Sequence, residues 1–166
     1  MAPAEASIGC EALAELLQND DATVVDLSLS TNYRNAHLPG AWFAIRSRLA
    51  HALAKKPEIP MRGTLVLTSE DGALASLAVA EARTLTNAAV RCLRGGNAAW
   101  QAAGYAVSAD AQMADDPVDV WRKPYERDGD ANRAMSEYLA WETDLLTRID
   151  RDGSCRFALS SQHALV

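Results

Sequence analysis

The sequence predicts an α/β domain with a central parallel sheet, followed by a helical extension. Short β-branched apolar runs alternate with helical patterns over residues 7–107. This order favours right-handed crossover connections between parallel strands. The chain has 166 residues, of which 49% are hydrophobic and 23% charged. These values are typical of a globular protein with one domain and an appended subdomain.

The first elements follow from hydrophobic spacing. Residues 11–17 predict a short helix, because leucines recur on one side of it. Residues 23–27 (TVVDL) and residues 64–68 (TLVLT) are β-branched apolar runs of strand length. They predict the first two central strands.

The next elements complete the alternation. Residues 73–85 predict a helix, with apolar side chains at three- and four-residue intervals. Residues 89–93 (AVRCL) predict a third strand, and Asn97 is the expected N-cap of a short helix over residues 98–102. Together the elements predict a sheet of four or five parallel strands with helices on both faces.

The pattern changes after residue 107. We expect three segments: a domain over residues 7–107, a polar linker over 108–117 and an extension over 118–166. One long amphipathic helix is predicted over residues 131–150, with Gly153 as its stop. The apolar stripe of this helix must be buried, either against its own domain or against a second subunit.

A polar loop directly follows the second predicted strand. In parallel sheets, ligands bind at the carboxyl ends of strands, near helix N-termini. This loop is therefore the candidate site, and it consists of Ser69, Glu70, Asp71, Gly72, Ala73 and Leu74.

Composition excludes several functional classes. A formal net charge of −6 makes nucleic acid an unexpected partner. No apolar run has the length of a membrane-spanning helix, and no secretory signal pattern is present, so we expect a cytoplasmic protein without a membrane partner. Cys10, Cys92 and Cys155 lack metal-ligand spacing, and we expect neither a metal nor a cofactor.

Two motifs resemble the signatures of the rhodanese family of sulfurtransferases. HLPGA at residues 37–41 follows Asp26 as in the first family signature, and LRGG at residues 93–96, followed by Trp100, resembles the closing one. The resemblance implies a three-layer sandwich with a central parallel sheet. It also implies structural roles for Asp26, His37, Gly40, Gly95, Gly96 and Trp100.

The resemblance implies where chemistry would occur. Active rhodaneses carry a loop cysteine that accepts sulfur as a persulfide, and Ser69 stands at that position here. Glu70 and Asp71 add negative charge, and Leu74 and Ser28 occupy positions where relatives often carry arginine. We therefore expect no catalytic residue in this domain. Related phosphatases of this fold also need the loop cysteine and a closing arginine, so we do not expect phosphatase activity either.

The same residues have structural interpretations. Ser69 is expected to cap the following helix, and Glu70 and Asp71 to stabilise its N-terminus. His37 is expected to make hydrogen bonds in the turn before Pro39, and Asp26 to bind loop backbone. A role for the loop carboxylates in binding a cationic partner is the rival interpretation.

Three functional hypotheses remain open. The leading one is an inactive rhodanese homologue with a structural or regulatory role, partnered by another rhodanese domain or by a second copy through the long helix. The second is an active thiosulfate sulfurtransferase that uses another thiol, Cys92. The third is an anion-binding module that uses the backbone of loop 69–74.

Overall fold

The computed structural model describes residues 6–54, 59–123, 126 and 129–153 of the chain. These residues fall into two compact units, Met1–Val120 and Trp121–Val166. We call them unit 1 and unit 2, and describe each by itself.

Unit 1 is built on one parallel sheet of six strands. Their spatial order is β1 (Ser7–Ile8), β5 (Val90–Leu93), β4 (Thr64–Thr68), β2 (Ala22–Asp26), β3 (Trp42–Phe43) and β6 (Gln112–Met113). All neighbouring pairs run parallel. The predicted α/β class is confirmed. The sheet exceeds the expected four or five strands because β1, β3 and β6 are two residues long, too short to show a period in the sequence.

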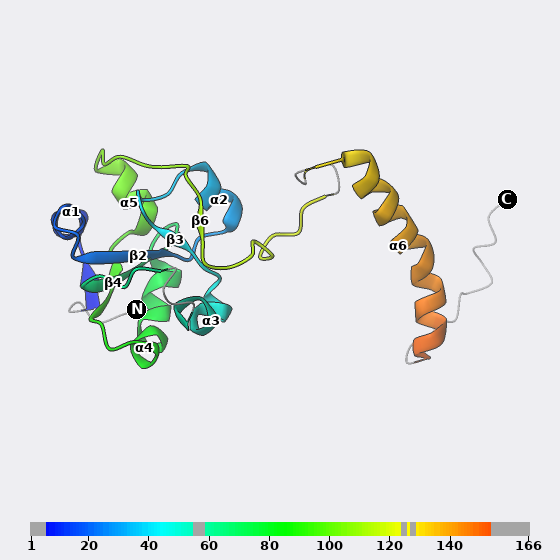
Figure 1. Ribbon diagram of the computed structural model, residues 1–166, viewed down its shortest axis with the longest axis horizontal. Helices are drawn as coiled ribbons and strands as arrows, with labels where there is room; N and C mark the ends of the chain where they lie inside the picture. The colour runs from blue at the N-terminus through cyan, green and yellow to red at the C-terminus, as the bar shows by residue number, and fades with distance from the viewer. Residues whose placement is uncertain (1–5, 55–58, 124–125, 127–128, 154–166) are drawn as a thin grey trace, which may run out of the picture. The chain divides into compact units, whose positions relative to one another are not determined.

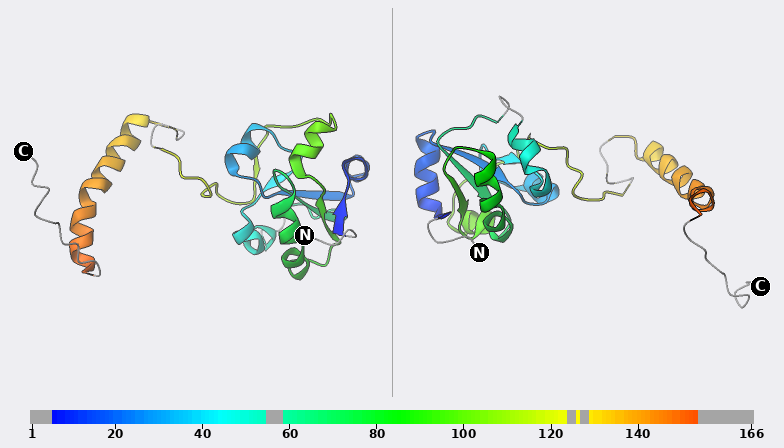
Figure 2. Two further views of the ribbon diagram at one scale, coloured as in Figure 1. Left: turned by 180° about the vertical axis from the view of Figure 1, so that it is seen from behind. Right: turned by 90° about the horizontal axis from the view of Figure 1, so that it is seen from below.

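Helices cover both faces of the sheet. Figure 1 shows α3 and α4 on one side of the strands and α2 and α5 on the other, and the view from behind in Figure 2 shows the same layers. The helices of unit 1 are α1 (Cys10–Gln18), α2 (Ser30–Asn35), α3 (Leu49–Ala54), α4 (Ala73–Leu85) and α5 (Gly96–Ala102). The result is the expected three-layer sandwich.

The alternation of side chains along β2 and β4 builds a core on each face. Val25 and Leu67 belong to the cluster beneath α3 and α4, whereas Val24 and Val66 belong to the cluster beneath α1, α2 and α5. Fully burying one such aliphatic side chain contributes about 1.5–3 kcal/mol. The two cores hold the strand ends, and hence the loops that follow them, in fixed positions.

Residues 108–117, where a polar linker was expected, pack on unit 1. Within this segment β6 pairs with β3, and the Ala114 amide donates to the Phe43 carbonyl at 2.9 Å. The carboxylate of Asp115 is buried and accepts from the Ile45 amide at 3.1 Å. His51 and Arg48 lie 3.4 Å and 3.6 Å from its second oxygen. The pairing of β6 with β3 and the hydrogen bond of Asp115 thus extend the domain beyond residue 107, up to the division after Val120.

Unit 2 contains the long helix α6 (Ala131–Asp152). The Asp130 side chain accepts from the amides of Asn132 and Arg133, and Gly153, at φ 60°, ends the helix. The helix extends two residues beyond the predicted range. None of the described residues of α6 is buried. None of the described helices combines the length and apolar character that a bilayer crossing requires.

The buried carboxylate of Asp115 tests whether the segment after residue 107 is part of the folded domain. We expect Asp115→Ala to lower the free energy of unfolding by about 1–3 kcal/mol, because the partly buried Ile45 amide loses its acceptor. The neighbouring Asp116 is exposed, so Asp116→Ala is the control and leaves stability within about 0.5 kcal/mol. Urea unfolding of both variants measures the difference. Equal midpoints would mean that this segment is dispensable for the fold.

Candidate functional site

The loop between β4 and α4 lies at the carboxyl end of the sheet, as predicted. β4 ends at Thr68 and α4 begins at Ala73. Gly72 is the N-cap of α4, and its φ of 79° is left-handed. A Cβ there would come within 2.8 Å of the Leu93 carbonyl oxygen, so glycine meets both a conformational and a steric requirement.

A buried polar network fixes the strand ends beside this loop. The Asn97 amide group donates to Oδ2 of Asp26 at 2.7 Å and to the Ser28 hydroxyl at 2.9 Å. Its carbonyl oxygen accepts from the Thr68 hydroxyl at 2.7 Å. The other oxygen of Asp26 accepts from the Ser28 amide at 2.8 Å and also from the Ser28 hydroxyl. The fully buried carboxylate therefore has donors for both oxygens.

The expected N-cap role of Asn97 is wrong. Gly95 is the N-cap of α5, without a side-chain cap hydrogen bond, and Asn97 lies inside the first turn. Its side chain turns inward because Asp26 and Thr68 are buried polar groups that need partners. A capping residue and a core-bridging residue cannot be distinguished from the local sequence alone.

The start of α5 also holds the loop backbone. The Asn97 amide donates to the Ser69 carbonyl, and the Ala98 amide to the Glu70 carbonyl, both at 2.9 Å. A Cβ at Gly96 would lie 2.0 Å from the Ser69 carbonyl oxygen and 2.3 Å from the Gly72 nitrogen. The close approach of loop and helix therefore depends on glycine at residue 96.

The three polar side chains of the loop are engaged locally. Ser69 is 2% exposed, and its hydroxyl accepts from the Ala75 amide at 3.2 Å. The Asp71 carboxylate accepts from the Ala73 amide at 2.9 Å, and Glu70 accepts from the Asn32 side chain at 2.6 Å. Two N–H groups at the start of α4 thus have side-chain oxygens of the loop as partners, where an anion would need free donors.

A cavity of about 240 Å³ opens beside the loop. Its described lining combines hydroxyl, carboxamide and carboxylate groups with two alanines, and none of these residues is Lys or Arg. The lining consists of Ser28, Asn32, Asn35, Ala36, Glu70, Asn97, Ala98 and Gln101. Ser69 is not in this lining, and Leu74, at the position expected for arginine, is 36% exposed. The cavity therefore offers polar contacts and one negative charge.

The remaining motif residues lie in the scaffold. His37 is buried, with Nδ1 2.6 Å from the Tyr33 carbonyl oxygen and its ring stacked on Tyr33 at 3.9 Å. The indole N–H of Trp100 donates to the Ala106 carbonyl at 2.8 Å. Gly40 has φ 75° in the turn before β3. None of these three residues lines the loop cavity in the described part of the chain.

The cysteines lie away from the loop. Cys92, in β5, is 4% exposed and packs in the cluster beneath α3 and α4. Burial raises the pKa of its thiol, which disfavours the nucleophilic thiolate. Cys10 begins α1 and is half-buried, and Cys155 lies outside the described residues. Across the part of the chain that the structure describes, no group of three His, Cys, Asp or Glu side chains is placed to hold a metal ion.

The sequence analysis located the loop but missed the network that supports it. Asn97 and Thr68 join Asp26 and Ser28 because the carboxyl ends of β2 and β4 are adjacent. The signal was a polar residue at the end of each of two neighbouring apolar strands, Asp26 in β2 and Thr68 in β4. Asn32, which binds Glu70, gave no signal because α2 is a short helix without a clear apolar period.

Comparisons with known proteins agree with the fold. The model of the rhodanese-like domain family matches residues 10–103. A thiosulfate sulfurtransferase from Pseudomonas aeruginosa is 34% identical, with a TM-score of 0.79 over 92% of this chain and 29% of its own. The chain thus spans under a third of that protein.

More distant structures share the fold alone. A rhodanese-related protein from Thermoplasma volcanium is 21% identical, with a TM-score of 0.51 over 63% of this chain and 98% of its own. A possible tyrosine phosphatase from Rhodopseudomonas palustris is 20% identical, with a TM-score of 0.54 over 61% of this chain and 83% of its own. Among curated proteins, none matches this chain significantly.

Substitution of Gly96 tests whether the close approach of the loop to α5 requires glycine. We expect Gly96→Ala to lower the free energy of unfolding by about 2 kcal/mol or more, because a side chain adds a steric clash to an unfavourable left-handed φ. Gly104→Ala is the control, since Gly104 has φ 79° but nothing within 4 Å of the added Cβ. Chemical denaturation compares them. If both variants lost the same stability, backbone conformation alone would explain the glycine at residue 96.

Proposed function

Because this chain belongs to the rhodanese-like domain family, we propose that it is a rhodanese domain without sulfurtransferase activity of its own. Its role is structural or regulatory, beside another rhodanese domain. The observation that supports this proposal is that a serine, Ser69, stands where the family carries its sulfur-accepting cysteine. A hydroxyl cannot accept sulfur as a persulfide, and a serine nucleophile needs an adjacent base that activates it. The Ser69 hydroxyl is buried and accepts a backbone hydrogen bond instead.

The charges around the loop support the same proposal. Thiosulfate is an anion, and the described cavity lining contains Glu70 but no Lys or Arg. Ser69 and Asp71 occupy two N–H groups at the start of α4, so fewer donors remain for an anion. These features also argue against an anion-binding module.

Cys92 is a poor substitute for the missing loop thiol. A sulfur-accepting thiol must ionise readily. Cys92 lies in β5 within the apolar cluster beneath α3 and α4, and burial raises the pKa of its thiol. The hypothesis of an active enzyme that uses Cys92 therefore lacks a readily ionised thiol.

The similarity to the Pseudomonas enzyme supports a tandem arrangement. The match covers 92% of this chain, more than unit 1 contains, so it extends into unit 2. The remaining length of that enzyme is more than twice the matched part. We infer that this chain is one domain, with its extension, of a larger tandem rhodanese protein or of an assembly of that kind.

The apolar side of α6 is the proposed contact surface. Five large apolar side chains on this helix are at least 36% exposed: Met135, Leu139, Trp141, Leu146 and Ile149. An isolated helix has marginal stability in water and depends on packing of its apolar face. We propose that this face is buried by another rhodanese domain, and by a second copy when the chain is alone. The cytoplasm, where Cys10 and Cys92 stay free thiols, is the proposed compartment.

Restoring the loop chemistry tests the assignment to Ser69. We expect no thiocyanate formation from thiosulfate and cyanide with the natural chain, and measurable formation with Ser69→Cys combined with Glu70→Gln and Asp71→Asn. The new thiol lies at the N-terminus of α4, which favours its thiolate. Asparagine at residue 71 keeps an oxygen for the Ala73 amide.

Two comparisons complete this assay. Ser69→Cys alone is expected to react more slowly than the triple variant, because Glu70 and Asp71 repel the anionic donor. Cys92→Ser, made in the natural chain, is expected to leave the baseline thiocyanate signal of that chain unchanged. Turnover by the natural chain that disappears in Cys92→Ser would refute the proposal and establish Cys92 as the sulfur carrier.

The helix face gives a separate prediction. We expect the purified chain to sediment as a dimer or larger species at micromolar concentration, and Leu139→Glu with Leu146→Glu to sediment as a monomer. Charges on the proposed interface oppose its burial. Glu137→Gln with Asp144→Asn alters exposed polar side chains of the same helix and is the control. A monomeric natural chain, or a variant that still associates, would contradict the proposed surface.

A further inference from the structure

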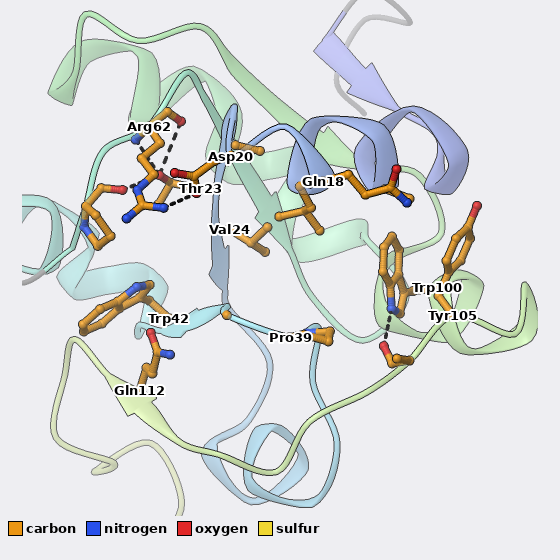
Figure 3. A pocket seen from close by; sticks show the side chains of 16 residues that line it. Gln18, Asp20, Thr23, Val24, Pro39, Trp42, Arg62, Trp100, Tyr105 and Gln112 are labelled. Atoms are coloured by element: carbon orange, nitrogen blue, oxygen red, sulfur yellow. Dashed lines mark hydrogen bonds and ion pairs between the residues drawn. The ribbon is translucent and has the colours of Figure 1, made fainter.

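Two cavities of unit 1 differ in the charge of their linings. The larger, of about 570 Å³, is shown in Figure 3 and contains one acidic and one basic side chain, Asp20 and Arg62. These two form an ion pair, so the described lining has no net charge that would select a ligand. The cavity beside the loop, of about 240 Å³, contains Glu70 and, among its described residues, no basic side chain. Of these two cavities, the one beside the loop therefore has a net negative charge.

The buried part of the loop cavity has already used its hydrogen-bond donors. Ser28 and Asn97 are the buried members of the described lining. The Asn97 carboxamide donates one N–H to Asp26 and the other to the Ser28 hydroxyl, and the Ser28 hydroxyl donates its own proton to Asp26. The Asn97 oxygen accepts from Thr68 and keeps a second lone pair. These side chains therefore offer an occupant acceptors and no donor.

A buried negative charge lies directly behind Ser28 and Asn97. Asp26 is 0% exposed, and the groups that donate to its carboxylate are neutral: the Ser28 amide, the Ser28 hydroxyl and the Asn97 carboxamide. Among the residues that the structure describes, none forms an ion pair with Asp26. Because buried charges are screened less than exposed ones, the field of Asp26 adds to that of Glu70 in the cavity. The cavity therefore favours a cation.

More exposed side chains add acceptors from three elements. Glu70 comes from the loop, Asn32 and Asn35 come from α2, and Gln101 comes from α5. One oxygen of Glu70 accepts from Asn32 at 2.6 Å, which fixes the carboxylate and leaves its second oxygen without a hydrogen bond from the described residues. The acceptors surround a space smaller than the roughly 300–1,000 Å³ of sites for drug-sized ligands. A single cationic side chain fits this combination of size and charge.

We propose that the loop cavity binds the guanidinium group of an arginine side chain of a partner protein. A guanidinium group is a permanent cation with N–H donors in one plane and no acceptor, so it matches acceptors that come from several walls. It is also more weakly hydrated than the ammonium group of lysine, which favours its burial at a protein contact. This inference rests on the proposed function, in which the domain acts through contact with a partner, and adds the chemistry by which the loop recognises that partner.

Charge also indicates that the arginine belongs to a protein. Free arginine carries a carboxylate, which has the same sign as Glu70 and Asp26 and finds no basic side chain in the described lining. Within a polypeptide the same carboxyl group is a neutral amide. An arginine side chain on a protein surface therefore meets the cavity without this repulsion.

Titration of the full chain with capped amino acids, followed by proton–nitrogen correlation NMR, tests the proposal. The probes are N-acetyl-arginine N-methylamide, the citrulline analogue, in which a neutral urea of similar shape replaces the guanidinium, and free L-arginine. We expect the capped arginine to shift the side-chain N–H signals of Asn32, Asn97 and Gln101 and to saturate at millimolar concentration. The capped citrulline and free arginine are each expected to bind at least about fivefold more weakly.

Variants of the loop carboxylates test the contact with Glu70. Glu70→Gln keeps an oxygen for the Asn32 side chain but removes the charge, and we expect it to weaken binding of the capped arginine at least about fivefold. Asp71→Asn removes a charge from the same loop outside the described lining and is the control. We expect it to weaken binding less than about twofold, because Asp71 does not contact the ligand.

A cation built into the cavity provides a second test. Ala98 is exposed and lines the cavity, whereas Ala80 is exposed on α4 outside the described lining. Ala98→Lys places an ammonium group where the guanidinium binds and is expected to abolish binding. Ala80→Lys adds the same charge elsewhere on the surface and is expected to preserve it.

Four results would contradict the assignment. Without saturable shifts at Asn32, Asn97 and Gln101, the cavity has no affinity for a guanidinium group. Equal binding of the capped citrulline would mean that charge is not recognised, and tighter binding of free arginine would indicate a site for a free amino acid. Equal losses in Glu70→Gln and Asp71→Asn would assign the effect to the overall charge of the chain. These measurements involve neither sulfur transfer nor association through α6, so failure of this inference is distinguishable from failure of the proposed function.

Discussion

The carboxamide of Asn97 joins the carboxyl ends of β2 and β4 to the first turn of α5, and the form of the loop depends on this junction. It supplies a donor to the buried Asp26 carboxylate and an acceptor to Thr68. Removing it would leave a charged group and a hydroxyl buried without that partner, which is costly in a protein interior. The same turn holds the carbonyls of Ser69 and Glu70. The loop geometry is therefore maintained by buried groups that lie outside the loop itself.

The long elements could be predicted from the sequence because each carries a strong hydrophobic period. The strand over residues 64–68 and the helix over residues 73–85 have the bounds that the periodicity predicts. The position of the loop followed from the rule that parallel strands end at the same edge. The resemblance carried by HLPGA and LRGG then indicated the family, which the match over residues 10–103 confirms.

Other features depend on tertiary contacts that local patterns do not encode. The strands β1, β3 and β6 are two residues long and are defined by their neighbours. Residues 108–117 read as a polar linker because the residues that anchor them, Met113, Ala114 and Asp115, are flanked by exposed polar ones. Asn97 was misassigned because its partners, Asp26 and Thr68, are far away in sequence.

We propose that no residue of unit 1 accepts sulfur from thiosulfate, because the buried hydroxyl of Ser69 occupies the position at which the family carries a thiol. Mass spectrometry of the intact chain after incubation with thiosulfate, followed by peptide mapping, tests it directly. We expect an unchanged mass for every peptide of unit 1. A gain equal to one sulfur atom, mapped to the peptide that contains Cys92 or to any other peptide of unit 1, would contradict it.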